Sequence, residues 1–257
     1  MLLAIDVGNT QTVIGVYRDN DLLHMWRLAT VKTHTADELR LKAGPLVEAA
    51  GILLADVDGA ALASVVPALT EAWEEALTEM LGAPPLVCSA IAAGGLFACD
   101  YPNPAEIGAD RVADAVAAKA LYGAPVVVVD FGTATNIEVV DADGVFVGGI
   151  IAPGVETSAQ ALFSRATKLA ATELADPGTA IGKSSAEAIQ IGIVHGEAAR
   201  VDGLVDAVFE QLGYRAPVVA TGGLAHRVAQ ASRTITDIDQ KLTLEGLRLI
   251  HAAQSKR

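Results

Sequence analysis

The chain has 257 residues, of which 52% are hydrophobic, and it carries 18 Lys and Arg against 31 Asp and Glu, for a formal net charge of −13 at pH 7. This length can bury one large core or two modest ones. The excess of negative charge repels nucleic acid and anionic membranes, so we expect neither as a partner.

The N-terminal segment lacks the basic region of a signal peptide, and no apolar run approaches membrane-spanning length. We therefore expect a cytoplasmic protein. In that reducing compartment the two cysteines, Cys88 and Cys99, are expected to remain free thiols. No spacing of Cys and His suggests a zinc site.

Hydrophobic periodicity and turn residues predict alternating helices and strands in both halves of the chain. In the first half the pattern predicts strands at 1–7, 12–18, 22–28, 60–65 and 85–88, and helices after Thr35 and at about 69–81 and 108–121. In the second half it predicts strands at 126–130, 135–140, 145–150 and 217–220, further helices, and a terminal helix within 238–254. We place the boundary near 122–124, which gives two α/β domains, 1–122 and 123–257.

A short polar pattern occurs once in each half, between two predicted strands. The two copies are Asp6-Val7-Gly8-Asn9-Thr10-Gln11-Thr12 and Asp130-Phe131-Gly132-Thr133-Ala134-Thr135-Asn136. In each copy glycine lets the backbone approach a ligand closely, Thr and Asn supply donors to phosphate oxygens, and Asp can hold a cation or its water. Either copy alone is also a good hairpin turn. The two copies together favour a phosphate clamp for a nucleotide with Mg²⁺.

Duplicated domains that each contribute a phosphate loop are the pattern of the actin-like ATPase fold, whose domains are ribonuclease H-like. The segment 218–225, a strand followed by Gly222 and Gly223, is similar to the adenosine-side loop of that superfamily. We therefore predict two duplicated actin-like domains with a nucleotide cleft between them. The length leaves little room for inserted subdomains, so this is a minimal version of the fold.

The segment 101–111 reads Tyr-Pro-Asn-Pro-Ala-Glu-Ile-Gly-Ala-Asp-Arg. Its prolines favour an extended stretch, after which Gly108 and Asp110 open a helix. The Asp110 carboxylate and the Arg111 guanidinium then lie at the positive N-terminus of that helix, a place that can bind an acidic substrate. The simpler interpretation is that Asp110 only stabilises the helix and that Arg111 is a surface charge.

Over nearly its full length the sequence resembles the type III pantothenate kinases. The motifs that carry the resemblance are, in chain order, Asp-Val-Gly-Asn-Thr at 6–10, Ser-Val-Val-Pro at 64–67, Tyr-x-Asn-Pro-x-x-x-Gly-Ala-Asp-Arg at 101–111, Asp-Phe-Gly-Thr-Ala-Thr at 130–135, Gly-Gly-x-Ile-x-Pro-Gly at 148–154 and Gly-Lys-x-x at 182–185. This combination, in this order, is highly specific.

The resemblance implies ATP-dependent phosphorylation of pantothenate to 4'-phosphopantothenate, the first step of coenzyme A synthesis. It also implies that Asp110 is the catalytic base, that Asp130 holds a monovalent cation (K⁺ or NH₄⁺), and that Asp6 is a candidate ligand of Mg²⁺. The residues implied in ATP binding are Asp6, Val7, Gly8, Asn9, Thr10, Gln11, Thr12, Val13 and Thr133. The residues implied in pantothenate binding are Tyr101, Gly108, Ala109, Asp110, Arg111 and Ser185.

The two phosphate loops contain no lysine, so a cation requirement is physically reasonable. Two positions depart from the family pattern, because Ser185 stands where Thr is usual and Asn136 follows the second loop where Thr is usual. Both remain polar. The segment 178–184 imitates a P-loop, but it is one residue short and follows no predicted strand, so we predict a loop that opens a helix.

That helix carries an apolar stripe. Its members are Val194, Ala198, Val201, Val205, Val208 and Leu212. Core packing is the simpler account of the stripe. Members of the resembled family are dimers, however, with the pantothenate pocket near the interface. We therefore expect a homodimer in which part of the stripe faces the second subunit.

Two alternatives to a pantothenate kinase stay open. One is an actin-like kinase of another small hydroxy acid, and the other is a catalytically silent nucleotide-binding regulator. The intact acidic residues Asp6, Asp110 and Asp130, together with Arg111, argue against the silent regulator.

Overall fold

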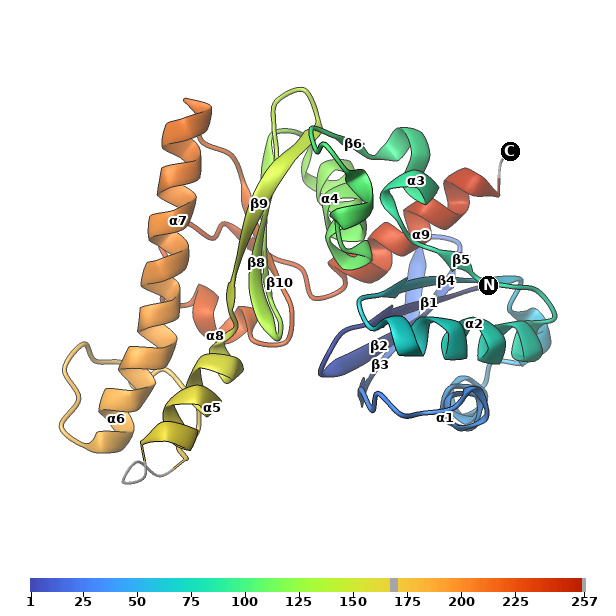
Figure 1. Cartoon of the computed structure of the whole chain (residues 1–257), viewed down its shortest axis with the longest axis horizontal. Helices are drawn as coiled ribbons and strands as arrows, with labels where there is room; N and C mark the ends of the chain where they lie inside the picture. Colours follow the sequence, from blue (N-terminus) through green and yellow to red (C-terminus); the bar gives the residue numbers. More distant parts are fainter. Residues whose placement is uncertain (167–170, 256–257) are drawn as a thin grey trace. The chain divides into compact units, whose positions relative to one another are not determined.

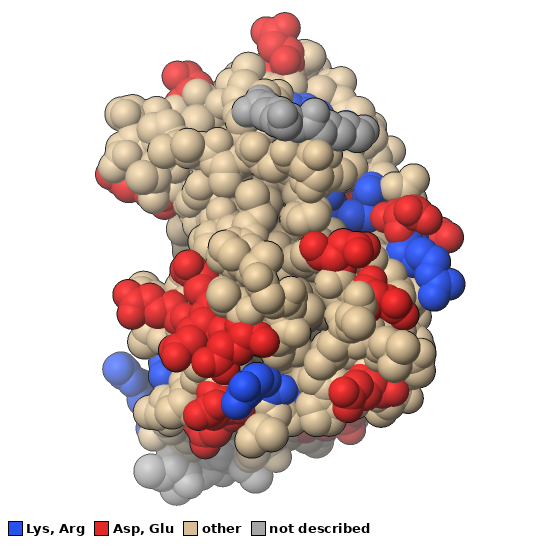
Figure 2. Space-filling view, turned by 90° about the vertical axis from the view of Figure 1, so that its right-hand side faces the viewer, with Lys and Arg blue, Asp and Glu red and all other residues tan. Residues whose placement is uncertain are grey.

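The structure is a computed structural model that describes residues 1–166 and 171–255. By its internal contacts the chain divides into two compact units (Figure 1). Unit 1 comprises Met1–Ala120 and Lys241–Arg257, and unit 2 comprises Leu121–Gln240. None of the described helices is long and apolar enough to cross a membrane. Acidic side chains gather on the face drawn in Figure 2, as expected from the negative net charge.

Unit 1 is built on a five-stranded sheet in the order β3-β2-β1-β4-β5. Its strands are β1 (Leu2–Val7), β2 (Gln11–Arg18), β3 (Asp21–Ala29), β4 (Gly59–Ser64) and β5 (Leu86–Val87). The pairs β1–β2 and β2–β3 are antiparallel, whereas β1–β4 and β4–β5 are parallel. Each strand predicted in the first half is confirmed, and each predicted end lies within two residues of the end observed in the structure.

Helices cover this sheet and complete its core. The helices of the first half are α1 (Ala36–Ala49), α2 (Pro67–Leu81), α3 (Ala90–Ala93) and α4 (Ala109–Tyr122), with short 3₁₀ turns at Leu54–Asp56, Gly94–Leu96 and Pro104–Glu106. Helices α1 and α2 lie side by side in Figure 1, and their buried faces share one hydrophobic cluster with the sheet. A capping box starts α1 directly after Thr35, where a helix is predicted: Glu38 N–H donates to Thr35 Oγ1 over 3.3 Å, and Thr35 N–H donates to Glu38 Oε2 over 2.9 Å.

The terminal helix α9 (Leu242–Gln254) belongs to unit 1, although its place in the sequence predicts that it belongs to the second half. Three contacts explain the difference. Leu244 packs over Gly15, and Gly246 lies so close to the Ala113 carbonyl of α4 that a Cβ there would clash with it. Thr243 Oγ1 also donates to Asp114 Oδ1 over 2.7 Å. A helix that follows the second sheet in sequence therefore closes the core of the first unit, and the domain division at 122–124 stays a prediction.

Unit 2 repeats the strand pattern of unit 1, in the order β11-β10-β7-β8-β9. Its strands are β7 (Val126–Phe131), β8 (Ala134–Val140), β9 (Val145–Pro153), β10 (Val218–Thr221) and β11 (Asp237–Ile238). Again the hairpin pairs β7–β8 and β8–β9 are antiparallel, while β10 pairs in parallel with β7 and with β11. The duplication predicted from the repeated polar pattern is thus present in the topology of the two sheets.

The helices of unit 2 are α5 (Val155–Arg165), α6 (Ser185–Gln190), α7 (Gly196–Leu212) and α8 (Ala225–Ala229). A π-helical turn at Ile191–His195 joins α6 to α7, so the three segments form one continuous helical run in Figure 1. Ser184 caps the start of α6, because its Oγ accepts from Glu187 N–H over 3.2 Å. The segment before it has no strand, which confirms the loop predicted in place of a P-loop.

The apolar stripe of α7 is core. Val194, Ala198, Val201 and Val205 are 0–1% exposed within the single chain, and Val208 and Leu212 pack against the same cluster. The stripe therefore packs against the sheet of unit 2, as the simpler account predicts. The expectation that part of it faces a second subunit stays a prediction for the half-buried Val208 and Leu212.

Candidate functional site

The first polar hairpin joins β1 to β2. Gly8 N–H donates to the Gln11 carbonyl over 3.0 Å and closes the turn. Asp6 lies on β1 opposite Val13, one residue before the strand ends. The turn residues Asn9, Thr10 and Gln11 are exposed. The hairpin thus presents amide and hydroxyl groups to solvent beside a carboxylate, which is the donor set expected of a phosphate loop.

A neighbouring segment, residues 30–32 after β3, supports this hairpin. Thr30 N–H donates to the Thr10 carbonyl over 2.9 Å, and the hydroxyls of Thr12 and Thr30 hydrogen-bond over 2.8 Å. Lys32 Nζ donates to Asn9 Oδ1 over 3.0 Å. No motif of the sequence points to this segment. Its Lys32 brings a cationic group to a loop that has no lysine of its own.

The second polar hairpin joins β7 to β8 and is braced by the start of α5. Gly132 N–H donates to the Ala134 carbonyl over 3.0 Å. The Thr133 carbonyl accepts from Gly154 N–H over 3.0 Å and from Thr157 Oγ1 over 2.7 Å. A Cβ on Gly154 would lie 2.6 Å from that carbonyl oxygen, so this close approach requires glycine. The Pro153-Gly154 motif of the sequence therefore holds the second hairpin in place against the start of α5.

A buried polar network lies behind the second hairpin. Thr135 Oγ1 donates to Glu197 Oε1 over 2.6 Å, and both side chains are buried. Glu197 also forms an ion pair with Arg200, whose Nη2 donates to the Pro153 carbonyl over 2.6 Å. Helix α7 thus holds both the strand after the hairpin and the strand that leads to α5.

Asp130 lies on β7, one residue before the strand ends, between two polar neighbours. It pairs with Asn136 on β8 and with Thr221 on β10. Because directly opposed residues project to the same side of a sheet, the Asn136 amide lies beside the Asp130 carboxylate. Asn136 Oδ1 is buried without a hydrogen-bond partner. An oxygen of this kind next to a carboxylate fits a bound cation.

The predicted substrate segment leads into α4 as expected. Asn103 caps a 3₁₀ turn at Pro104–Glu106, and α4 then begins at Ala109. Asp110 lies in the first turn of α4, where its Oδ1 accepts from Arg111 N–H over 2.8 Å. The Arg111 side chain is buried, which is unusual for a surface charge. Gly108 permits this arrangement, because a Cβ there would lie 2.5 Å from Asp110 Oδ1.

The electrostatics of this helix start favour a proton acceptor. Burial raises the pKa of the Asp110 carboxyl, although the hydrogen bond from Arg111 N–H and the Arg111 charge oppose the rise. Nearby, burial raises the pKa of the Cys88 thiol to about 12, with contributions from the negative charges of Asp110, Asp6 and Asp114. The fold therefore brings Asp6 of the first hairpin and Asp110 of the substrate segment to the surroundings of one thiol. Cys88 and Cys99 are both free, as expected.

Ser185 opens α6 in unit 2, whereas Tyr101 and residues 108–111 belong to unit 1. Its predicted contact with the substrate stays a prediction. Among the described residues, no group of three or more His, Cys, Asp and Glu could hold a metal ion.

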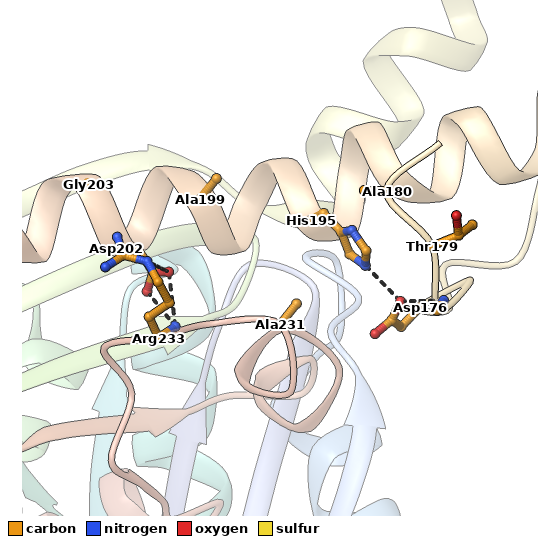
Figure 3. Close-up of a pocket in the computed structure, with 10 residues that line it drawn as sticks. Asp176, Thr179, Ala180, His195, Ala199, Asp202, Gly203, Ala231 and Arg233 are labelled. Atoms are coloured by element: carbon orange, nitrogen blue, oxygen red, sulfur yellow. Dashed lines mark hydrogen bonds and ion pairs between the residues drawn. The ribbon is translucent and has the colours of Figure 1, made fainter. Parts of the chain in front are cut away.

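A pocket of about 540 Å³ lies beside α7 in unit 2, and none of the predicted site residues lines it. Its polar groups are largely paired with one another (Figure 3). His195 points from the helix to Asp176, with 2.7 Å between Nε2 and Oδ1. Asp202 accepts from Ser232 Oγ and from the N–H groups of Arg233 and Thr234. Neither polar hairpin contributes a lining residue to this pocket.

Comparisons with known proteins identify the family of the chain. A family model described as type III pantothenate kinase matches residues 2–207. A protein of that name from Halalkalibacterium halodurans is 43% identical over 251 residues, with 98% of each chain covered. Another from Roseiflexus sp. is 44% identical over 251 residues, again with 98% of each chain covered.

Solved structures show the fold. An activator of 2-hydroxyisocaproyl-CoA dehydratase from Clostridium difficile, with bound ADPNP, aligns with a TM-score of 0.60 at 13% identity, covering 100% of this chain and 97% of that one. A ROK hexokinase from Thermus thermophilus aligns with a TM-score of 0.52 at 16% identity, covering 99% of each chain. The fold is the duplicated actin-like fold of ATPases and sugar kinases, and the chain belongs to the type III pantothenate kinase family.

Proposed function

We propose that this chain carries out the reaction of its family, in which the γ-phosphoryl group of ATP is transferred to the primary hydroxyl of pantothenate. The product is 4'-phosphopantothenate, and the step opens coenzyme A synthesis. The observation that supports this function most directly is the partly buried Asp110, with its raised pKa, in the same surroundings as Asp6. Burying a carboxylate destabilises the fold, and a catalytically silent regulator would have no need of such a residue here.

Asp110 is the general base. A carboxylate whose pKa is raised accepts a proton more readily than an ordinary one. It takes the proton of the attacking hydroxyl as the new oxygen–phosphorus bond forms. Arg111 is in place to pair with the carboxylate of pantothenate, because a buried guanidinium favours an anionic partner. Tyr101, Gly108, Ala109 and Ser185 complete the proposed substrate contacts.

The two hairpins hold ATP. The first offers the exposed groups of Asn9, Thr10 and Gln11, and the second offers Thr133. Asp6 is the proposed carboxylate ligand of Mg²⁺. Magnesium in phosphoryl-transfer sites is usually held by one or two carboxylates together with phosphate oxygens, so a single Asp fits. When bound, the ion neutralises charge that develops on the phosphates.

Asp130 and the Asn136 amide form the proposed site of a monovalent cation. The buried Asn136 Oδ1 needs a partner, and a cation beside Asp130 would satisfy it. Potassium or ammonium would supply positive charge next to the second hairpin. The Thr usual at position 136 offers a hydroxyl oxygen, so Asn136 preserves an oxygen ligand.

Assembly and location complete the proposal. We expect a cytoplasmic homodimer, as the family resemblance implies. Since Val201 and Val205 are core residues, the interface must use other surfaces. Sedimentation velocity of the unmodified chain measures the oligomeric state, and a monomer at all concentrations would contradict this part of the proposal.

The deciding experiment is a coupled assay of ADP release with ATP and pantothenate, with and without K⁺. Identification of 4'-phosphopantothenate by mass spectrometry confirms the acceptor. Turnover with other small hydroxy acids but not with pantothenate would favour the second kinase interpretation. Nucleotide binding without turnover on any of these acceptors would favour the silent regulator.

A further inference from the structure

We infer that Lys32 is a positioning residue for the first phosphate hairpin and supplies that hairpin with its missing positive charge. Lys32 orients the Asn9 amide and stands beside the proposed place of the ATP phosphates. This inference rests on the proposed role of the hairpin in ATP binding. It adds a residue that none of the sequence motifs contains.

The segment that carries Lys32 is anchored to the hairpin it serves. Two residues earlier, Thr30 N–H donates to the Thr10 carbonyl over 2.9 Å and the Thr30 hydroxyl contacts that of Thr12 over 2.8 Å. These bonds fix the start of the segment at the phosphate turn. Lys32 then reaches Asn9 Oδ1 over 3.0 Å. The contact is therefore part of a three-point attachment between two loops.

The contact also selects the orientation of the Asn9 amide. An asparagine side chain has one acceptor oxygen and one NH₂ donor, and it can rotate to exchange them. An ammonium group can only donate, so Lys32 requires the oxygen of Asn9 on its own side. The NH₂ group then faces away from Lys32, where it can donate to a phosphate oxygen.

The charge of Lys32 matters because it opposes negative charge already present at the hairpin. The chain has a net charge of −13, and Asp6 adds a carboxylate at the base of the same hairpin. A triphosphate that approaches this hairpin meets negative charge unless cations are present. Lys32 is exposed, so its ammonium group is accessible to a ligand in solvent. A charge-assisted hydrogen bond from it would strengthen phosphate binding.

The test is ATP binding by Lys32→Gln, Lys32→Arg, Asn9→Ala and a control, Lys42→Gln. Lys42 is an exposed lysine of the same region that contacts His34 instead of the hairpin. Calorimetry with a non-hydrolysable ATP analogue and Mg²⁺ gives Kd, and steady-state assays give KM for each substrate. Lys32→Gln should weaken nucleotide binding roughly tenfold, as expected for loss of a hydrogen bond to a charged group. The KM for pantothenate should stay within about twofold, because the change affects only the nucleotide side.

Two further readouts separate positioning from general stability. Lys32→Arg keeps the charge and should restore most of the nucleotide affinity. The salt dependence of nucleotide binding should be weaker in Lys32→Gln than in the parent, since one cationic contact is gone. Thermal unfolding should be unchanged in both variants, because the side chain is exposed.

Other results would overturn the inference. An unchanged Kd in Lys32→Gln, or an equal loss in Lys42→Gln, would show that Lys32 has no specific role. If Asn9→Ala binds nucleotide normally, the hairpin itself is not the phosphate site, and the proposed role of the hairpin fails together with that of Lys32. If Asn9→Ala loses binding while Lys32→Gln does not, only the Lys32 inference fails.

Discussion

Thr135, on the strand that follows the second phosphate hairpin, donates its hydroxyl to Glu197 of α7 over 2.6 Å, and both side chains are buried. Arg200 pairs with the same carboxylate and reaches the Pro153 carbonyl. Buried polar groups are stable only when their partners remain in place. The second hairpin therefore depends on a helix more than sixty residues away in the sequence.

Glu197→Ala should destabilise the protein, because it leaves the Thr135 hydroxyl buried without its acceptor and Arg200 without its counter-charge. Loss of a hydrogen bond to a charged group typically costs about 1.5–3 kcal/mol. Urea unfolding followed by circular dichroism measures the change. Glu210→Ala is a matched control, since Glu210 is exposed on the same helix and should change the free energy of unfolding by less than about 0.5 kcal/mol. Equal stability of the two variants would show that the network is dispensable.

Asp110→Asn should separate activity from stability. Loss of the general base should lower kcat by about 10²- to 10⁴-fold, while the ATP analogue still binds. An activity above half that of the parent would remove Asp110 from the mechanism.

The same variant should be more stable than the parent at neutral pH. Burial raises the pKa of Asp110 in the folded state above its unfolded value, so the ionised carboxylate destabilises the fold. This destabilisation is fully present at pH values above the pKa of Asp110 in the folded state. It disappears as the pH falls below the pKa of Asp110 in the unfolded state. The stability difference between Asp110→Asn and the parent should therefore shrink as the pH is lowered through that window. Urea unfolding of both proteins from pH 7.5 to pH 3.5 measures this difference, and a difference that stays constant over the range would contradict the prediction.

The local parts of this fold were predictable from sequence, and the long-range parts were not. The strands on each side of Asp6 and of Asp130 follow from apolar runs that flank a turn, and the start of α1 follows from Thr35 and Glu38. In contrast, nothing in the spacing of Lys32, Glu197 or Gly246 indicates their partners, because each contact joins segments far apart in the chain. Motif resemblance predicts the reacting residues, whereas the supporting contacts required the structure.

The stripe of α7 shows the same limit in a different form. Its spacing of three and four residues predicts one apolar face, but periodicity does not say whether that face meets a sheet or a second subunit. Because Val201 and Val205 are buried within a single chain, this part of the apolar face packs against the sheet.

Val201→Glu should consequently unfold unit 2, because it places an unpaired charge in the core. Such changes belong to the most destabilising class, roughly 4 kcal/mol or more. Ala207→Glu, at an exposed position of the same helix, introduces the same charge and should leave the fold intact. Circular dichroism melts of the two variants compare them directly. A cooperative, parent-like melt for Val201→Glu would mean that the stripe is less buried than the structure indicates.

The proposed cation site gives the last prediction. Activity should require Mg²⁺ and rise strongly with K⁺ or NH₄⁺, and Asp130→Ala should lose the response to the monovalent ion, because the carboxylate that holds it is gone. Asn136→Ala should keep the response but need more K⁺ for half-maximal activity, since one neutral oxygen ligand is removed from beside a carboxylate that remains. Asn136→Thr, which restores the residue usual in the family, should respond close to the parent, as a hydroxyl oxygen replaces the amide oxygen. Initial rates across a K⁺ titration at constant ionic strength, balanced with choline, measure all four proteins. Full parent activity in Na⁺ alone would exclude a selective site at Asp130, and a parent-like titration of Asn136→Ala would remove the amide from the ligand set.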